Sequence, residues 1–345
     1  MNVLLSLIGV LLLAGLAWLG VEKLHVEVLF GVVLPYLAVV LFLGGLVAKV
    51  LGWARSHVPF RVTTTSGQQR SLPWIKSSTF DSPHSGWGVL GRMALEVLFF
   101  RSLFRNTRAE LKGGGKLVHG PTKWLWLAAL AFHYSFLIIF VRHFKFFSQP
   151  VPKPIEWLGA LDGFFQVGLP MLYLTDLILV GALTYLLVRR LFIPQIRYIS
   201  LASDYFPLFL IGGVAVTGIL MRYFFKVDVV GAKALALSLV SLHPVIPKGV
   251  GTIFFVHLFM VSSLIAYFPF SKLAHMAGVF LSPTRNLANN NRAVRHANSW
   301  PVAVRDRVYP RWTKLHTYAE YEDEFRGKMI AAGIPVEKSA EAKSA

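Results

Sequence analysis

The chain has 345 residues, of which 55% are hydrophobic and 15% are charged, whereas about 25% of the residues of a soluble domain are charged. The formal net charge is +18, but the basic residues lie between long apolar runs. Lys and Arg are placed in this way in the cytoplasmic loops of membrane proteins. We therefore interpret the chain as an integral membrane protein and expect no nucleic-acid partner. The absence of cysteine excludes disulfides, cysteine-ligated iron–sulfur clusters, thiol nucleophiles and covalent C-x-x-C-H haem attachment.

Residues 1–53 predict two N-terminal transmembrane helices. The first apolar run, residues 2–21, is about one bilayer thick. No Lys or Arg precedes it and no A-x-A-like site follows it, so we expect a retained helix rather than a cleaved signal peptide. The second run, residues 28–53, contains Pro35, which is expected to kink the helix.

Residues 54–121 predict a basic cytoplasmic loop with an amphipathic helix. Residues 88–106 place apolar side chains at helical spacing, with arginines on the other side. That pattern is typical of a helix that lies on the membrane or under a partner. The glycines between Lys112 and Lys116 predict a flexible connector rather than a phosphate loop, because no G-K-[ST] follows.

Residues 122–276 predict a four-helix core, and residues 277–345 predict a polar cytoplasmic tail. The whole chain is thus expected to be an all-α integral membrane protein of the inner membrane with six transmembrane helices. Because the basic segments must share one side, both termini are expected to be cytoplasmic. The expected spans are residues 2–21, 28–53, 124–147, 169–188, 205–225 and 250–272.

Four histidines, His133, His143, His257 and His275, lie in or at the end of the third and sixth expected spans. Ionisable residues inside a span are costly and by default functional. If the two helices are antiparallel, His133 faces His275 at an inner level and His143 faces His257 at an outer level, about 15 Å away. Each level offers two neutral imidazoles, the ligand set of six-coordinate haem iron, which suits electron transfer. The alternative is four histidines that are hydrogen-bonded to backbone carbonyls within the bundle.

The spacing within each helix complicates this pairing. In an ideal helix, side chains ten residues apart point in directions that differ by about 80°, so His133 and His143 do not lie on the same face. The separation of His257 and His275 would be about 27 Å in a straight helix. Pro269 lies between them, and a kink or helix end there would shorten the rise.

The H-x9-H and H-x17-H spacings resemble those of the gamma subunit family of respiratory nitrate reductase, a di-haem cytochrome b family. The resemblance covers about residues 122–280. It implies two haem b groups, with His133 and His275 as ligands of the inner haem and His143 and His257 as ligands of the outer haem. The extra first helix and the long loop that contains Pro59 to Pro83 depart from that family.

That loop and the six-span layout resemble the DsrM family, the membrane cytochromes of the sulfite-reduction-associated DsrMKJOP complex. This resemblance implies membership of a larger quinone-linked oxidoreductase complex, active in dissimilatory sulfur metabolism. The chain would exchange electrons between menaquinone or menaquinol and a cytoplasmic iron–sulfur subunit that resembles heterodisulfide reductase (DsrK-like). The lack of cysteine agrees with clusters being held by a partner.

Four charged residues are candidates for secondary roles. Asp176 and Lys145 are candidates for a quinone site or proton relay, because such a site needs polar groups near a haem edge. Their ordinary alternatives are a hydrogen-bonded core carboxylate and a snorkelling cation. Arg142 and Arg222 are candidates for pairing with haem propionates.

Two other functions remain open from the residues. One is a haem b membrane anchor of another respiratory oxidoreductase, similar to that of succinate dehydrogenase. The other is a haem-free transporter or channel that uses the histidines as a proton relay.

Overall fold

The structure is a computed structural model that describes residues 1–56, 67–71, 74–105, 108–163, 171–289 and 326–333. These residues are mostly helical, as expected. Parts of the expected Pro59–Pro83 loop, the start of the expected fourth span and most of the expected tail lie outside the described residues.

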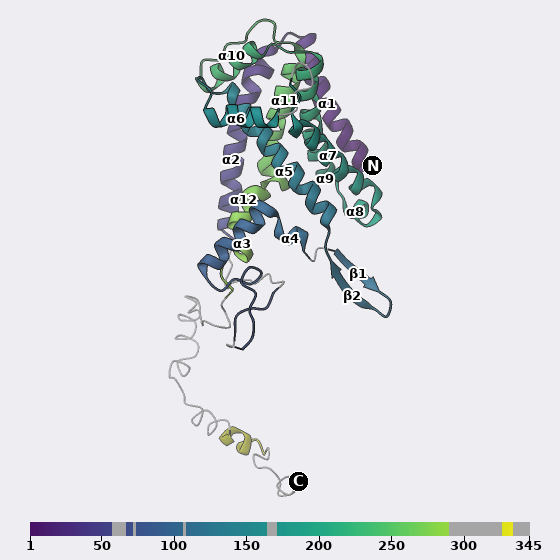
Figure 1. Cartoon of the computed structure of the whole chain (residues 1–345), viewed down its shortest axis with the longest axis vertical. Helices are drawn as coiled ribbons and strands as arrows, with labels where there is room; N and C mark the ends of the chain where they lie inside the picture. Colours follow the sequence, from purple (N-terminus) through teal and green to yellow (C-terminus); the bar gives the residue numbers. More distant parts are fainter. Residues whose placement is uncertain (57–66, 72–73, 106–107, 164–170, 290–325, 334–345) are drawn as a thin grey trace.

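Long apolar helices form a bundle (Figure 1). Of the described helices, five are long and apolar enough to cross a membrane, and the second of them starts with the π turn η1. Helix α7 has 19 residues but is not among the five. It contains three charged residues, Asp176, Arg189 and Arg190, which make it more polar than the others. The bundle helices are α1 (Asn2–Glu22), η1 (Leu29–Val33) with α2 (Leu34–Ala54), α5 (Lys123–His143), α7 (Leu174–Phe192), α9 (Ala202–Ile219) with η3 (Leu220–Phe224), and α11 (Thr252–Tyr267).

The expected distortion near Pro35 takes the form of that π turn. Its last bond runs from the N–H of Leu34 to the carbonyl of Leu29, five residues back. Proline has no N–H to donate, and its ring crowds the preceding turn of a helix. The wide turn lets the chain continue through Pro35 as one span, Leu29–Ala54.

Neighbouring helices pack through a core in which Leu210, Leu235 and Met260 are almost completely buried. Helix α5 packs against α7, whereas α11 packs against α1, α2 and α9. On the outside of the bundle, by contrast, Leu12 is 67% exposed and Val40 is 66% exposed. Large exposed apolar side chains along whole helices are the expected surface of a protein that faces lipid.

One end of the bundle, here called the hairpin end, carries the two described strands (Figure 1). Strands β1 (Arg108–Lys112) and β2 (Lys116–Gly120) are antiparallel, with Lys112 opposite Lys116. Gly114 and Gly115 adopt positive φ angles of 81° and 75°, which glycine tolerates without a Cβ clash. The expected connector is therefore the turn of a hairpin, and the chain is not purely helical.

The expected amphipathic helix is present at the same end but is broken. It consists of α3 (Gly86–Phe99) and α4 (Arg101–Phe104), separated by the left-handed residue Phe100. Arg92 is buried, whereas Trp87, Leu90 and Leu98 are exposed. The apolar face of α3 is thus turned outward, and Arg92 lies on the side that faces the protein.

Ion pairs fasten α3 and α4 to neighbouring segments. Arg285, in the short helix α13 (Pro283–Asn286), lies 3.1 Å from the carboxylate of Glu96. Arg101 hydrogen-bonds the carboxylate of Asp81 and holds the pKa of that carboxyl below its usual range. Arg105 adds a second ion pair to Asp81 at 3.0 Å.

The opposite end, here called the α10 end, holds two helices that the sequence reading placed in loops (Figure 1). They are α6 (Lys153–Asp162) and α10 (Val229–Val240). The short helix α8 (Pro194–Ile199) joins α7 to α9 at the hairpin end.

Candidate functional site

The inner pair of histidines comes together at the hairpin end of the bundle. The ring centres of His133, on α5, and His275, the first residue of α12 (His275–Leu281), are 6.1 Å apart, with an interplanar angle of 83°. Two imidazoles that bind opposite sides of one metal atom at about 2.0–2.1 Å have ring centres about 6.4 Å apart. The two rings thus have the separation that a shared haem iron requires.

A break after α11 brings His275 to this position. Pro269 lies in a 3₁₀ turn, Phe268–Phe270, and Ser271 then extends the chain with φ −116° and ψ 179°. A second 3₁₀ turn, Lys272–Ala274, leads into His275. The expected role of Pro269 as the point where the helix ends is confirmed.

Helix α2 makes room for this break at Gly45. A Cβ atom at Gly45 would lie 2.7 Å from Cγ of Pro269 and 2.8 Å from Cζ of Phe270. Real Cβ atoms do not approach other heavy atoms so closely, so a side chain here would push the turn away. Gly45 therefore helps to set the position of His275.

The outer pair lies towards the α10 end. His143 is the last residue of α5, and His257 lies on α11. Both residues thus lie at the same end of the bundle. The structure brings the inner pair, His133 and His275, into contact, as expected from an antiparallel α5 and α11.

Each of the four rings is held through Nδ1. Because a carbonyl oxygen only accepts, Nδ1 of three of these rings carries the proton and Nε2 keeps its lone pair. Among the described residues, Nε2 of His133, His143 and His275 has no hydrogen-bond partner. The Nδ1 contacts are His133 to the carbonyl of Ala129 (2.7 Å), His143 to that of Ile139 (2.7 Å), His275 to that of Lys272 (2.8 Å) and His257 to the hydroxyl of Thr217 (2.9 Å).

Thr217 fixes the tautomer of His257. Its hydroxyl lies 2.8 Å from the carbonyl of Gly213 and 3.1 Å from that of Val214, so its hydrogen is used within α9 and its oxygen accepts from Nδ1 of His257 at 2.9 Å. At Gly218, a Cβ would lie 3.4 Å from the ring of His257, so a small residue favours this close approach. The sequence reading missed Thr217, since a lone threonine in an apolar helix carries no pattern of its own.

These features fit haem. A metal-bound histidine usually donates its second ring nitrogen to a carbonyl or another acceptor, as all four do here. The rings of Phe100 and Phe132 pack at 4.9 and 5.0 Å from His133 and give the inner pair apolar surroundings. Haem brings four ligands of its own, so two histidines complete it; no cluster of three or more His, Asp or Glu side chains occurs within the described residues.

A buried polar network lies beside His143 at the α10 end. The guanidinium of Arg142 pairs with Asp162 at 3.0 Å and with Asp176 at 2.9 Å. The ring of Tyr173 lies against the same guanidinium at 3.6 Å. The network ties α5 to α6 and α7, and removal of one partner of such a buried pair costs about 3–5 kcal/mol.

The remaining candidate residues join this network. The hydroxyl of Tyr223 donates to Asp176 at 3.1 Å, and Arg222 donates to the carbonyl of Met171 at 2.9 Å. Arg222 stacks on Tyr173 at 4.1 Å, and Lys145 lies 6.0 Å from the same ring. The structure thus brings Arg142, Lys145, Asp176 and Arg222 together around Tyr173.

The sequence alone did not indicate Asp162, which lies between the third and fourth expected spans. Asp162 accepts two hydrogen bonds from Thr175, at 2.9 and 2.6 Å, in addition to its ion pair. An acidic residue beside an apolar run was the only signal that could have found it.

The chain is similar to several known proteins. Two similar proteins are named Hdr-like menaquinol oxidoreductase cytochrome b-like subunit. The one from Archaeoglobus fulgidus is 44% identical over 81% of this chain and 85% of its own length, and the one from Archaeoglobus profundus is 42% identical over 80% and 85%. A third relative, which belongs to the dihydromethanophenazine:CoB–CoM heterodisulfide reductase of Methanosarcina thermophila, is 23% identical over 58% of this chain and 73% of its own length.

The family profile of the nitrate reductase gamma subunit matches residues 85–297, which include all four histidines and the polar network. With this match and the 44% identity above, the chain belongs to the nitrate reductase gamma subunit family.

Proposed function

We propose that the chain is a di-haem cytochrome b subunit that passes electrons from menaquinol to a cytoplasmic iron–sulfur partner. His133 and His275 hold the inner haem, and His143 and His257 hold the outer haem. The observation that carries the proposal is that all four rings are anchored through Nδ1, with Nε2 of His133, His143 and His275 left for a metal. A bis-histidine haem has no open coordination position, so it supplies one-electron transfer only.

In the membrane, we place six spans with both termini in the cytoplasm. The sixth span is α7, which packs between α5 and α9 inside the bundle although its charge excludes it from the five most apolar helices. Arg189 and Arg190 lie in its last turn, where a cytoplasmic helix end is expected. The hairpin end then faces the cytoplasm, and the inner haem lies nearest to the partner.

Arg142 and Arg222 are proposed to pair with haem propionates. Nε of Arg142 is buried and has no hydrogen-bond partner among the residues that the structure describes. A buried guanidinium N–H without an acceptor is costly, and a propionate oxygen would satisfy it.

Asp176 and Lys145 are proposed as groups of a quinone site or proton relay on the His143 side. Lys145 lies two residues after His143, and Asp176 pairs with Arg142, the residue before His143. The hydroxyl of Tyr223 extends the hydrogen-bond chain from Asp176, and Tyr173 links Lys145 to the same network.

Two observations support the proposed partner: the absence of cysteine in this chain and the names of its relatives. A chain without cysteine holds no iron–sulfur cluster through thiolates, so onward transfer needs a second protein. The names of the Archaeoglobus relatives indicate an Hdr-like menaquinol oxidoreductase. We propose a DsrK-like iron–sulfur protein as partner, within a DsrM-type multi-subunit complex of dissimilatory sulfur metabolism.

The first experiment is a dithionite-reduced minus oxidised spectrum of the purified chain. We expect a b-type haem band and two haems per chain. His143→Ala and His257→Ala should each remove one haem and leave the other largely intact, because both belong to the outer pair. A missing haem band would instead favour the transporter, and equal loss of both haems in each variant would contradict the crosswise pairing.

The relay has its own test. Asp176→Asn keeps the side-chain size but removes the charge, so we expect slower haem reduction by a quinol analogue in stopped-flow measurements. Glu156→Gln, on the exposed face of α6, is the matched control and should react at the wild-type rate. Equal rates in both variants would exclude Asp176 from the relay.

A further inference from the structure

A hollow of about 450 Å³ lies at the hairpin end, beside the turn that leads to His275. It is lined by Lys49 and Trp53, near the end of α2, and by Tyr267 and Lys272, around the break after α11. Helix α2 lies outside the residues that the family profile matches. Part of this hollow is therefore built by a segment beyond the region shared with that family.

The first two helices diverge towards this end. At the α10 end they touch, since a Cβ at Gly20 of α1 would lie 2.3 Å from the ring of Phe30, in the π turn before α2. Towards the hairpin end α1 and α2 separate, and α11 packs against both (Figure 1). Phe270, at the end of the span that contains α11, lines the hollow and is 64% exposed. The hollow is therefore open at the surface of the bundle that faces lipid.

The charged groups at the hollow are positive on balance. Lys49 makes no ion pair or hydrogen bond within the described residues. Lys272 pairs with Asp204 at 2.5 Å, which uses one of the three N–H donors of its ammonium group. The other oxygen of Asp204 lies 4.0 Å from Arg190, so this carboxylate has two cationic partners of its own. Lys49 and the remaining donors of Lys272 are thus left for an anionic group.

Lys49 lies close to the depth of lipid headgroups. It belongs to the span Leu29–Ala54, and Ala54 is about 7.5 Å further along the helix at 1.5 Å per residue. Trp53 lies one turn after it, and tryptophan is enriched where a span meets the headgroups. The ordinary alternative is a cation that only extends into water, but that alternative makes no use of the hollow. Basic pockets between transmembrane helices at this level are typical binding places for anionic lipid headgroups.

We propose that this hollow binds an anionic phospholipid of the leaflet at the hairpin end. Its phosphate is held by Lys49 and Lys272, and an acyl chain lies along the exposed ring of Phe270. The bound lipid braces α2 against the turn that leads to His275. The inference requires a bundle that spans a bilayer, but it does not depend on haem or on quinol.

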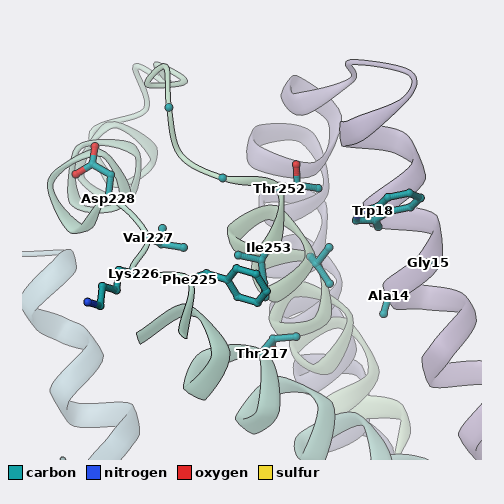
Figure 2. Close-up of a pocket in the computed structure, with 13 residues that line it drawn as sticks. Ala14, Gly15, Trp18, Thr217, Phe225, Lys226, Val227, Asp228, Thr252 and Ile253 are labelled. Carbon is teal, nitrogen blue, oxygen red and sulfur yellow. The ribbon is translucent and has the colours of Figure 1, made fainter. Parts of the chain in front are cut away.

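A larger cavity, at the α10 end, offers no such charge. It measures about 680 Å³ and lies between α1 and the segments that carry η3 and α11 (Figure 2). Of its two charged lining residues, Lys226 points away from the cavity (Figure 2). The other, Asp228, caps α10 by accepting from the N–H of Val230 at 2.9 Å. That cavity therefore has apolar walls for a lipid but no cation directed at a phosphate.

The nearest competitor for the hollow at the hairpin end is a propionate of the inner haem, because His275 also lines it. A propionate would need the cations but not an apolar wall that is open to lipid. The exposed ring of Phe270 and the ring of Trp53 provide such a wall, and this favours a ligand that carries both an anion and a hydrocarbon chain.

The test is native mass spectrometry of the purified full-length chain, titrated with phosphatidylglycerol or with phosphatidylcholine of the same acyl chains. We expect tighter binding of phosphatidylglycerol, and at least threefold weaker binding of it to Lys49→Gln. Lys123→Gln removes an exposed lysine at the start of α5, at the same end of the bundle, and should bind as wild type.

Two further measurements separate the lipid from other anions. Inorganic phosphate should not displace phosphatidylglycerol, and a redox titration should give the same inner-haem potential for Lys49→Gln and wild type. Equal lipid binding by Lys49→Gln and wild type, or equal losses in both lysine variants, would overturn the proposal. Displacement by inorganic phosphate would assign the hollow to a free anion, and a shifted inner-haem potential with unchanged lipid binding would assign it to a propionate.

Discussion

At the scale of single residues, the feature that matters most is the hydrogen bond that each of the four histidines makes through Nδ1. Three rings use a backbone carbonyl of their own helical region as the Nδ1 acceptor. His257 uses a side chain of another helix instead, the hydroxyl of Thr217 on α9. The orientation of the His257 ring therefore depends on tertiary packing, whereas the other three orientations depend mainly on local structure.

Substitution of Thr217 tests this dependence. Thr217→Val keeps the shape but leaves Nδ1–H of His257 without an acceptor, at a cost of about 1–3 kcal/mol. We expect a lower thermal midpoint and a shifted midpoint potential for the outer haem, measured by redox titration of the b-type band. Thr217→Ser keeps the hydroxyl and should titrate as wild type; a wild-type titration for both variants would show that the hydrogen bond has no such role.

At the scale of elements, the decisive feature is the break between α11 and α12. Pro269 ends the long helix, and two 3₁₀ turns carry the chain to His275. The close approach of Gly45 on α2 leaves room for Pro269 and Phe270. The inner pair thus depends on three separate segments, α2, α5 and the broken α11.

Gly45→Ala tests the fit at this break. The added Cβ would overlap Pro269, and such overpacking typically costs about 1–3 kcal/mol. We expect His275 to shift and the inner haem to be lost or weakened, with the outer haem retained, as measured by haem content per chain. Gly44→Ala, next in sequence but in open space, is the control, and equal haem content in the two variants would contradict the prediction.

The orientation of helix α3 also depends on its packing. Its polar face turns towards the protein because Glu96 pairs with Arg285, and its end is tied to α5 by the hydroxyl of Tyr134, which donates to the carbonyl of Leu98 at 2.8 Å. Periodicity identified an amphipathic helix, but the direction of its faces depended on partners far away in the sequence.

At the scale of the whole molecule, the two ends of the bundle differ in character. The hairpin end gathers α3, α4, the hairpin and the start of α1, where the side chain of Asn2 donates to the carbonyl of Ser200 at 3.2 Å. The α10 end gathers α6, α10 and the network around Arg142. Electrons that move from the outer to the inner pair would cross about half of the roughly 30 Å hydrocarbon core towards the hairpin end.

Because the chain contains no cysteine, its orientation can be tested with single-cysteine variants. Gly113→Cys lies in the turn of the hairpin, and Ser241→Cys lies just after α10; both positions are exposed. In intact cells, a membrane-impermeant maleimide should label Ser241→Cys but not Gly113→Cys, and both should react after lysis. The reverse pattern in intact cells would place the hairpin end outside.

The sequence by itself determined the helical membrane class, the position of most spans and the four histidines, because apolar length and costly ionisable residues are local properties that lipid makes unambiguous. It also indicated that Pro269 ends a helix, since a missing N–H acts locally. Only the tertiary structure decided that His275 reaches His133, that Thr217 holds His257, and that Asp162 joins Arg142. Each of these contacts joins side chains from separate helices, and their spacing depends on packing that no single segment encodes.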